Sequence, residues 1–94
     1  MQQEAELIVQ TYPENDQRFQ YDFGEHITLQ AQAKDNIGLD TIVFYIDDHE
    51  LVRQSQPPYA VPWRLTAGEH ILQVEAIDFA GNVSQASILF IVDE

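Results

Sequence analysis

Hydrophobic and polar residues alternate along most of this chain. The apolar positions recur at every second residue, and no stretch carries the apolar stripe of an amphipathic helix over three turns. Because successive side chains of a strand point to opposite faces, this pattern predicts strands that each bury one face. Seven strands are predicted, and they span Leu7–Tyr12, Ile27–Ala33, Thr41–Ile46, Leu51–Gln54, Tyr59–Arg64, His70–Ile77 and Ala86–Val92.

The predicted strands are separated by turn signals that contain Pro, Gly, Asn or Asp, where the backbone must reverse or take a positive φ. Short strands with such regular turns indicate a sandwich or a barrel. Pro62 has no N–H to donate, so its strand should lie at a sheet edge or carry a bulge. The predicted core consists of Leu29, Ile42, Phe44, Ile46, Trp63, Leu72, Val74 and Phe90.

Length and composition fit a single globular domain. The chain has 94 residues, of which 45% are hydrophobic, and independent cores need roughly 50 to 200 residues each. The domain is predicted to span residues 7–94, with residues 1–6 as a linker or as residues added to the start. Because the chain has no cysteine, disulfides, thiolate metal sites and a cysteine nucleophile are excluded.

The charge of the chain is strongly negative. Sixteen acidic residues oppose four Lys and Arg residues, for a net charge of −12. This balance repels phosphate backbones and anionic lipids, so no nucleic-acid partner is expected. No direct membrane insertion is expected either, because no apolar run approaches the roughly 18 residues of a span. Residues 1–6 lack the pattern of a signal peptide, so the protein is either cytoplasmic or a segment of a longer exported chain.

A specific order of motifs runs from Thr41 to Gln85. An apolar-x-Phe-Tyr-apolar-Asp strand is followed by a short strand, Pro-Tyr, Trp, an Ala-Gly-x-His turn and an Ala-x-Asp-x-x-Gly-Asn loop. This order resembles bacterial immunoglobulin-like domains appended to secreted glycoside hydrolases, adhesins and cell-envelope proteins. It departs from them at Asp48, where glycine is common, and at Pro62. The resemblance implies a seven-stranded, immunoglobulin-like antiparallel β-sandwich with a non-catalytic accessory role, located extracellularly or in the cell envelope.

The motif Ala-x-Asp-x-x-Gly occurs twice, at residues 33–38 and 76–81. In an immunoglobulin-like sandwich these two loops lie at the same end, so their carboxylates could approach each other. Calcium takes about six to eight oxygen ligands, and this end offers only two carboxylates beside amide and backbone oxygens. The preferred interpretation is one turn used twice, in which each Asp accepts bonds from loop amides and each Gly takes a positive φ. The alternative calcium ligands are Asp35, Asn36, Asp78 and Asn82.

The three histidines, His26, His49 and His70, are predicted to lie at the opposite pole. A zinc or nickel ion is conceivable there, but their spacing matches no compact metal motif. In the preferred interpretation, His70 bonds the Ala67–Gly68 turn and the other two are solvated, so no metal or cofactor is expected. No serine has a nucleophile-elbow pattern and no pair of carboxylates stands out, so the protein is not expected to be an enzyme.

The outer face of the third, sixth and seventh predicted strands suggests an interaction surface. A contiguous apolar patch on a domain surface usually marks an interface, here with an adjacent domain of a larger protein or with a second copy in a homodimer. Alternatively, Gln73 and Glu75 break the patch and leave it solvated. The predicted patch consists of Val43, Tyr45, Ile71, Ile77, Leu89 and Ile91.

The preferred function is therefore a spacer and interaction module of a larger secreted or cell-envelope protein. The alternative is a carbohydrate-binding module of a polysaccharide-active enzyme, because exposed aromatic rings stack on sugars. Alternation places Tyr59 and Trp63 on the inward face, which weakens this alternative. The rings considered for glycan binding are Tyr12, Tyr21, Tyr45, Tyr59 and Trp63.

Overall fold

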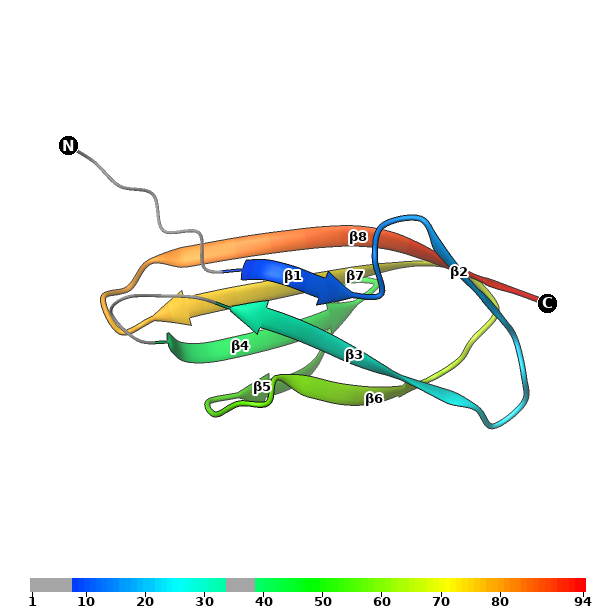
Figure 1. Cartoon of the computed structure of the whole chain (residues 1–94), viewed down its shortest axis with the longest axis horizontal. Helices are drawn as coiled ribbons and strands as arrows, with labels where there is room; N and C mark the ends of the chain where they lie inside the picture. The colour runs from blue at the N-terminus through cyan, green and yellow to red at the C-terminus, as the bar shows by residue number, and fades with distance from the viewer. Residues whose placement is uncertain (1–7, 34–38) are drawn as a thin grey trace.

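The computed structural model describes residues 8–33 and 39–94, and these residues form eight strands in two sheets (Figure 1). One sheet has the order β1-β3-β6 and the other β2-β8-β7-β4-β5. The architecture is a β-sandwich, which confirms the predicted fold class. The strands are β1 (Ile8–Tyr12), β2 (Gln17–Gln20), β3 (His26–Ala33), β4 (Leu39–Ile46), β5 (His49–Gln54), β6 (Ala60–Arg64), β7 (Gly68–Asp78) and β8 (Val83–Asp93).

The strand β2 was not among those that alternation predicts, so the described count is eight and not seven. Its sequence, QRFQ, contains a single apolar residue, and a pattern of period two cannot be recognised in it. β2 pairs in parallel with β8, whereas the other pairs are antiparallel. Phe19 explains why it docks there, since its ring packs edge-on against Phe90 at 6.0 Å between centroids.

The position of β6 agrees with the constraint that Pro62 imposes. β6 is an edge strand of the three-stranded sheet, and Pro62 is exposed opposite Thr28 of β3. An edge strand needs ladder hydrogen bonds on one side only, so the missing N–H is tolerated. Trp63 is half-buried and packs against the core, as predicted.

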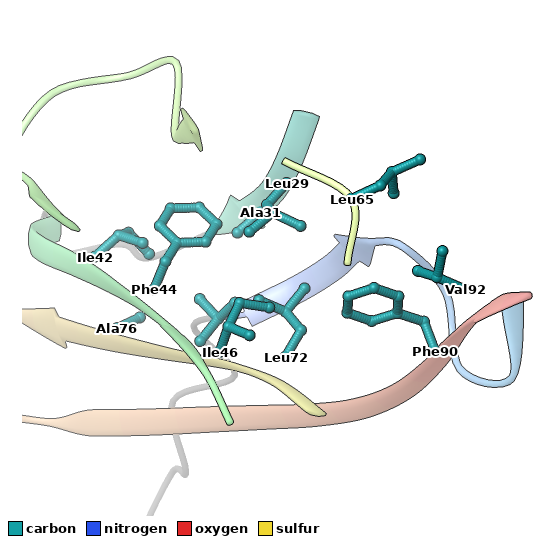
Figure 2. Close-up of a cluster of buried hydrophobic side chains, with 11 residues drawn as sticks. Leu29, Ala31, Ile42, Phe44, Ile46, Leu65, Leu72, Ala76, Phe90 and Val92 are labelled. Atoms are coloured by element: carbon teal, nitrogen blue, oxygen red, sulfur yellow. The ribbon is translucent and has the colours of Figure 1, made fainter. Parts of the chain in front are cut away.

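The core lies between the two sheets. Figure 2 shows Ile42 and Phe44 of β4 reaching toward Leu29 and Ala31 of β3, which closes the space between the layers. The predicted core is confirmed, with Trp63 at its margin. The cluster consists of Leu29, Ala31, Ile42, Phe44, Ile46, Leu65, Leu72, Val74, Ala76, Phe90 and Val92.

The domain is elongated along its strands. In Figure 1, β1 and β8 run in the same direction along the long axis, so β8 finishes at the end of the sandwich away from the start of β1. The described residues include no helix that is long and apolar enough to span a membrane. The predicted linker at residues 1–6 lies outside the described residues.

Candidate functional site

The outer face of the five-stranded sheet carries the predicted patch, but Val43 at its centre is fully buried, with 0% of its surface exposed. Its neighbours Ile42 and Phe44 belong to the core cluster, so Val43 points to the outer face. Arg53 and Glu75 lie directly opposite it on β5 and β7, and side chains opposite each other on one face are close enough to cover it. The prediction that Val43 is exposed is therefore wrong.

A band of polar contacts crosses the middle of this face. The Tyr45 hydroxyl donates to Glu75 Oε1 at 3.3 Å, and Gln85 Nε2 donates to Glu75 Oε2 at 3.4 Å. Partial burial and the adjacent Glu75 carboxylate raise the pKa of Tyr45, so its hydroxyl keeps the donated proton. On the β5 side, Arg53 and Glu50 form an exposed ion pair at 2.9 Å. These polar groups interrupt the apolar outer face, and Glu75 is one of the two residues that the alternative interpretation names.

What remains near one end is a smaller group, Ile71, Leu89 and Ile91, which we name the β7–β8 cluster. Ile71 lies opposite Leu89 in the antiparallel ladder, and Ile91 lies on the same face of β8 as Leu89. Ile71 is exposed, whereas Leu89 and Ile91 are half-buried. Ile77 is separated from this cluster by the polar band.

The border of the β7–β8 cluster is charged. Arg18 of β2 lies beside Ile91 in the parallel ladder and forms a two-pronged hydrogen bond with Asp93 at 2.8 and 3.0 Å. The hydrogen bond from Arg18 lowers the pKa of Asp93. The cluster is thus a small apolar area next to an ion pair, and it is not the extended patch that alternation predicts.

The loop at Asp78 is a turn held by its own side chain. Asp78 is buried, and its Oδ1 accepts from the N–H groups of Ala80 at 2.9 Å and Asn82 at 2.7 Å. Its Oδ2 accepts from Asn82 Nδ2 at 2.9 Å, and Gly81 takes a positive φ of 91°. This arrangement confirms the turn interpretation for residues 76–81. The other candidate ligands, Asp35 and Asn36, lie outside the described residues.

The structure does not bring the three histidines together. His26 and His49 are exposed, whereas His70 is buried. Within residues 8–33 and 39–94, no group of three or more His, Cys, Asp or Glu side chains could hold a metal ion. The partner predicted for His70 is close to the one observed: its Nε2 lies 2.7 Å from the carbonyl oxygen of Thr66, just before the Ala67–Gly68 turn.

His70 has a second partner, Asp47, that sequence reasoning missed. Nδ1 of His70 lies 2.8 Å from Asp47 Oδ2, and Asp47 Oδ1 accepts from the Ile71 N–H at 2.9 Å. Asp47 follows β4 and has a positive φ of 51°. The sequence feature that could have indicated a role for Asp47 is the Asp47–Asp48 pair in the turn, since Asp is among the few residues that tolerate a positive φ.

The aromatic rings considered for glycan binding are mostly engaged within the domain. Tyr21, Tyr59 and Trp63 pack against the core. Tyr12 is exposed, but its ring packs edge-on against Phe19 and its hydroxyl accepts from a glutamine side chain. With Tyr45 bonded to a carboxylate, these rings do not form a shared stacking surface.

Two exposed rings were not anticipated from the sequence. Phe23 is 81% exposed and Phe79 is 69% exposed. They occupy the β2–β3 and β7–β8 loops, which lie at opposite ends of the sandwich (Figure 1). The guanidinium of Arg64 stands 5.6 Å from the centre of the Phe23 ring, a cation–π distance. Alternation predicts exposure only within strands, so loop rings escape it.

Comparisons with known proteins agree with this architecture. The fibronectin(III)-like modules of Clostridium thermocellum CbhA are similar in structure, with a TM-score of 0.75 and 21% sequence identity over 89% of this chain and 94% of that chain. CopC from Methylosinus trichosporium OB3b has a TM-score of 0.55 and 14% identity over 93% of this chain and 92% of that chain. At these identities the likeness concerns the fold alone.

A comparison with curated protein sequences finds no match. The family described as bacterial Ig domain matches residues 8–74, which include β1 to β6 and much of β7. This match agrees with the two-sheet sandwich and with the motif order between Thr41 and Gln85. The chain therefore belongs to the bacterial Ig domain family.

Proposed function

We propose that this domain is a non-catalytic accessory module of a larger secreted or cell-envelope protein, in which it holds neighbouring domains apart. The observation that carries the proposal is the course of the chain. β8 finishes at the end of the sandwich away from the start of β1 (Figure 1). A domain with this geometry can separate a preceding domain from a following one by the length of its strands.

The buried polar side chains form hydrogen bonds within the fold, which supports a structural role for the domain. Asp78 accepts three hydrogen bonds from its own turn, and both ring nitrogens of His70 contact acceptors within the fold. A general base or a nucleophile must instead have a lone pair that is accessible to a substrate. These buried groups therefore serve the fold.

Contact with a neighbouring domain is a second part of this proposal. The β7–β8 cluster is the surviving portion of the predicted patch. Its exposed Ile71 and the Arg18–Asp93 ion pair next to Ile91 suit a small interface with an apolar centre and a polar rim. We propose an adjacent domain of the same protein as the partner. A homodimer or a bound glycan would be the competing outcomes.

The test of the spacer role is removal of residues 8–94 from the full-length parent protein. Small-angle X-ray scattering should show a shorter maximum dimension, while activities carried by the other domains persist. Replacement by an unrelated β-sandwich of similar length should restore the dimension. Loss of a catalytic activity that this replacement does not restore would overturn the proposal.

Glycan binding is tested separately by affinity electrophoresis of the domain in gels that contain soluble polysaccharides. A spacer should migrate at the same rate with and without polysaccharide. Retardation that disappears in Tyr12→Ala or Phe23→Ala would instead establish the carbohydrate-binding alternative, since those rings are exposed.

A further inference from the structure

The ring of His70 lies at the start of β7, with only 8% of the residue exposed, and both of its nitrogens face acceptors. Nε2 is 2.7 Å from the carbonyl oxygen of Thr66, and Nδ1 is 2.8 Å from Asp47 Oδ2. A carbonyl oxygen and a carboxylate oxygen can only accept hydrogen bonds. Two such partners therefore require a proton on each ring nitrogen, unless the Asp47 carboxyl carries one of the protons itself.

Of these two possibilities, the surroundings of Asp47 favour an ionised carboxylate over a protonated carboxyl. Burial raises its pKa, but the hydrogen bonds from His70 and from the Ile71 N–H outweigh burial and leave the pKa below its ordinary value. The Asp47 side chain is 42% exposed, so water also solvates its charge. The proton between the two groups therefore belongs to the ring.

The His70 ring has aromatic neighbours and one charged partner. Trp63 of β6 and Phe90 of β8 pack against it, with ring centroids at 4.9 and 5.4 Å. Asp47 is its charged partner in the β4–β5 turn, and His49 of the same hairpin interacts electrostatically with Asp47.

The charged residues next to Trp63 and His70 in the sequence face away from the ring. Arg64, next to Trp63 on β6, turns toward the exposed Phe23 ring. Glu69, next to His70 on β7, is exposed, because alternation places it on the outer face. From β8, the neighbours of the ring are apolar, since Phe90 and Val92 both belong to the core cluster.

We propose that His70 is an imidazolium ion in the native protein and that its second proton fastens the start of β7 to the β4–β5 turn. The unfolded chain lacks both acceptors, so folding takes up a proton at this position. Stability falls with rising pH wherever the native state binds more protons than the unfolded state. The contribution is therefore present in mildly acidic solution, where Asp47 is still ionised, and is lost as the pH rises to the point at which the folded protein gives up this proton.

Loss of that proton leaves the ring with a lone pair directed at an acceptor. One buried hydrogen bond is then missing, and a buried polar group without its partner destabilises the native state. Asp47 also bonds β7 through its own N–H, which donates to the carbonyl oxygen of Ile71 at 2.9 Å. Deprotonation therefore weakens one of several contacts that hold this turn, and the domain stays folded but becomes less stable.

The first test is nitrogen-15 NMR of the histidine side chains in the folded wild-type domain at pH 7. We expect both ring nitrogens of His70 to show the chemical shifts of protonated nitrogens. An unprotonated ring nitrogen in His70 would overturn the proposal. This measurement does not depend on whether any variant folds.

The second test is urea unfolding between pH 6 and 8.5 of the wild type, Asp47→Asn and the matched control Asp48→Asn. Both substitutions remove one negative charge from the same turn, at positive φ values of 51° and 71° that asparagine tolerates. In the wild type and in Asp48→Asn, the unfolding constant should rise with pH, by at most about tenfold per pH unit for one proton. In Asp47→Asn the rise should be smaller. Equal pH dependence in all three proteins would overturn the proposal.

Discussion

The side-chain amide of Gln54 forms two hydrogen bonds with the backbone of Ala60. Its Nε2 donates to the carbonyl oxygen at 2.8 Å, and its Oε1 accepts from the N–H at 3.0 Å. Gln54 ends β5 and Ala60 begins β6, so the pair joins edge strands of the two different sheets. A side-chain amide thus takes the place of a neighbouring strand at this edge.

Substitution of Gln54 by Ala should lower the free energy of unfolding by about 1 to 3 kcal/mol, because a half-buried N–H and C=O lose their partners. Gln56→Ala is the control, since Gln56 is exposed in the same loop. Urea denaturation measures both. Equal stability of the two variants would show that water replaces the amide without cost.

Substitution of Phe44 by Ala should cost about 3 to 5 kcal/mol, because it leaves a cavity between the sheets. That loss is comparable with the whole stability of many domains of this size. Phe79→Ala removes the same atoms from an exposed loop and should change the melting temperature little. Thermal unfolding followed by circular dichroism compares them, and similar melting temperatures would contradict the core position of Phe44.

Millimolar calcium should leave the melting temperature nearly unchanged, because the Asp78 carboxylate already accepts three hydrogen bonds from its own turn. A site with a Kd tenfold below the calcium concentration would add about 1.4 kcal/mol, which thermal unfolding detects. A rise of several degrees in the wild type that is absent in Asp78→Asn would refute the turn interpretation.

Acidification should remove the stability that Asp47 contributes. The pKa of its carboxyl is lowered in the folded protein, so the contribution is present above the unfolded value of about 4 and is lost as pH falls through the folded value. Relief of repulsion among the other carboxylates acts in the opposite direction, so the informative quantity is a difference between variants. Between pH 6 and 3, Asp48→Asn should lose more stability than Asp47→Asn in urea unfolding, and parallel curves would contradict the assignment.

Substitution of Ile71 by Lys should abolish contact through the β7–β8 cluster, because a charge at the centre of an apolar interface is costly to bury. Gln85→Lys adds the same charge on the exposed outer face of β8 and should leave the contact intact. Pull-down with the adjacent domains measures binding, and sedimentation velocity reports any homodimer. Identical binding by both variants would place the contact elsewhere.

Features set by neighbouring residues could be predicted from the sequence. Alternation within β4 places Ile42 and Phe44 on one face, and that face is buried because a strand with an apolar side must pack against another layer. The turn at Asp78 could equally be predicted, since the Ala80 and Asn82 donors to its carboxylate lie within four residues of it. Such features depend on backbone geometry over a few residues.

Features that depend on distant partners were decided by the tertiary structure. β2 has one apolar residue, and it forms a strand because it pairs with the edge of β8, more than 60 residues later in the chain. Val43 is buried by residues of the strands on either side of it. His70 contacts Asp47, which lies 23 residues earlier in the chain. Alternation predicts the face on which a side chain lies, but what covers it there depends on the register of neighbouring strands, which pairing and packing set together.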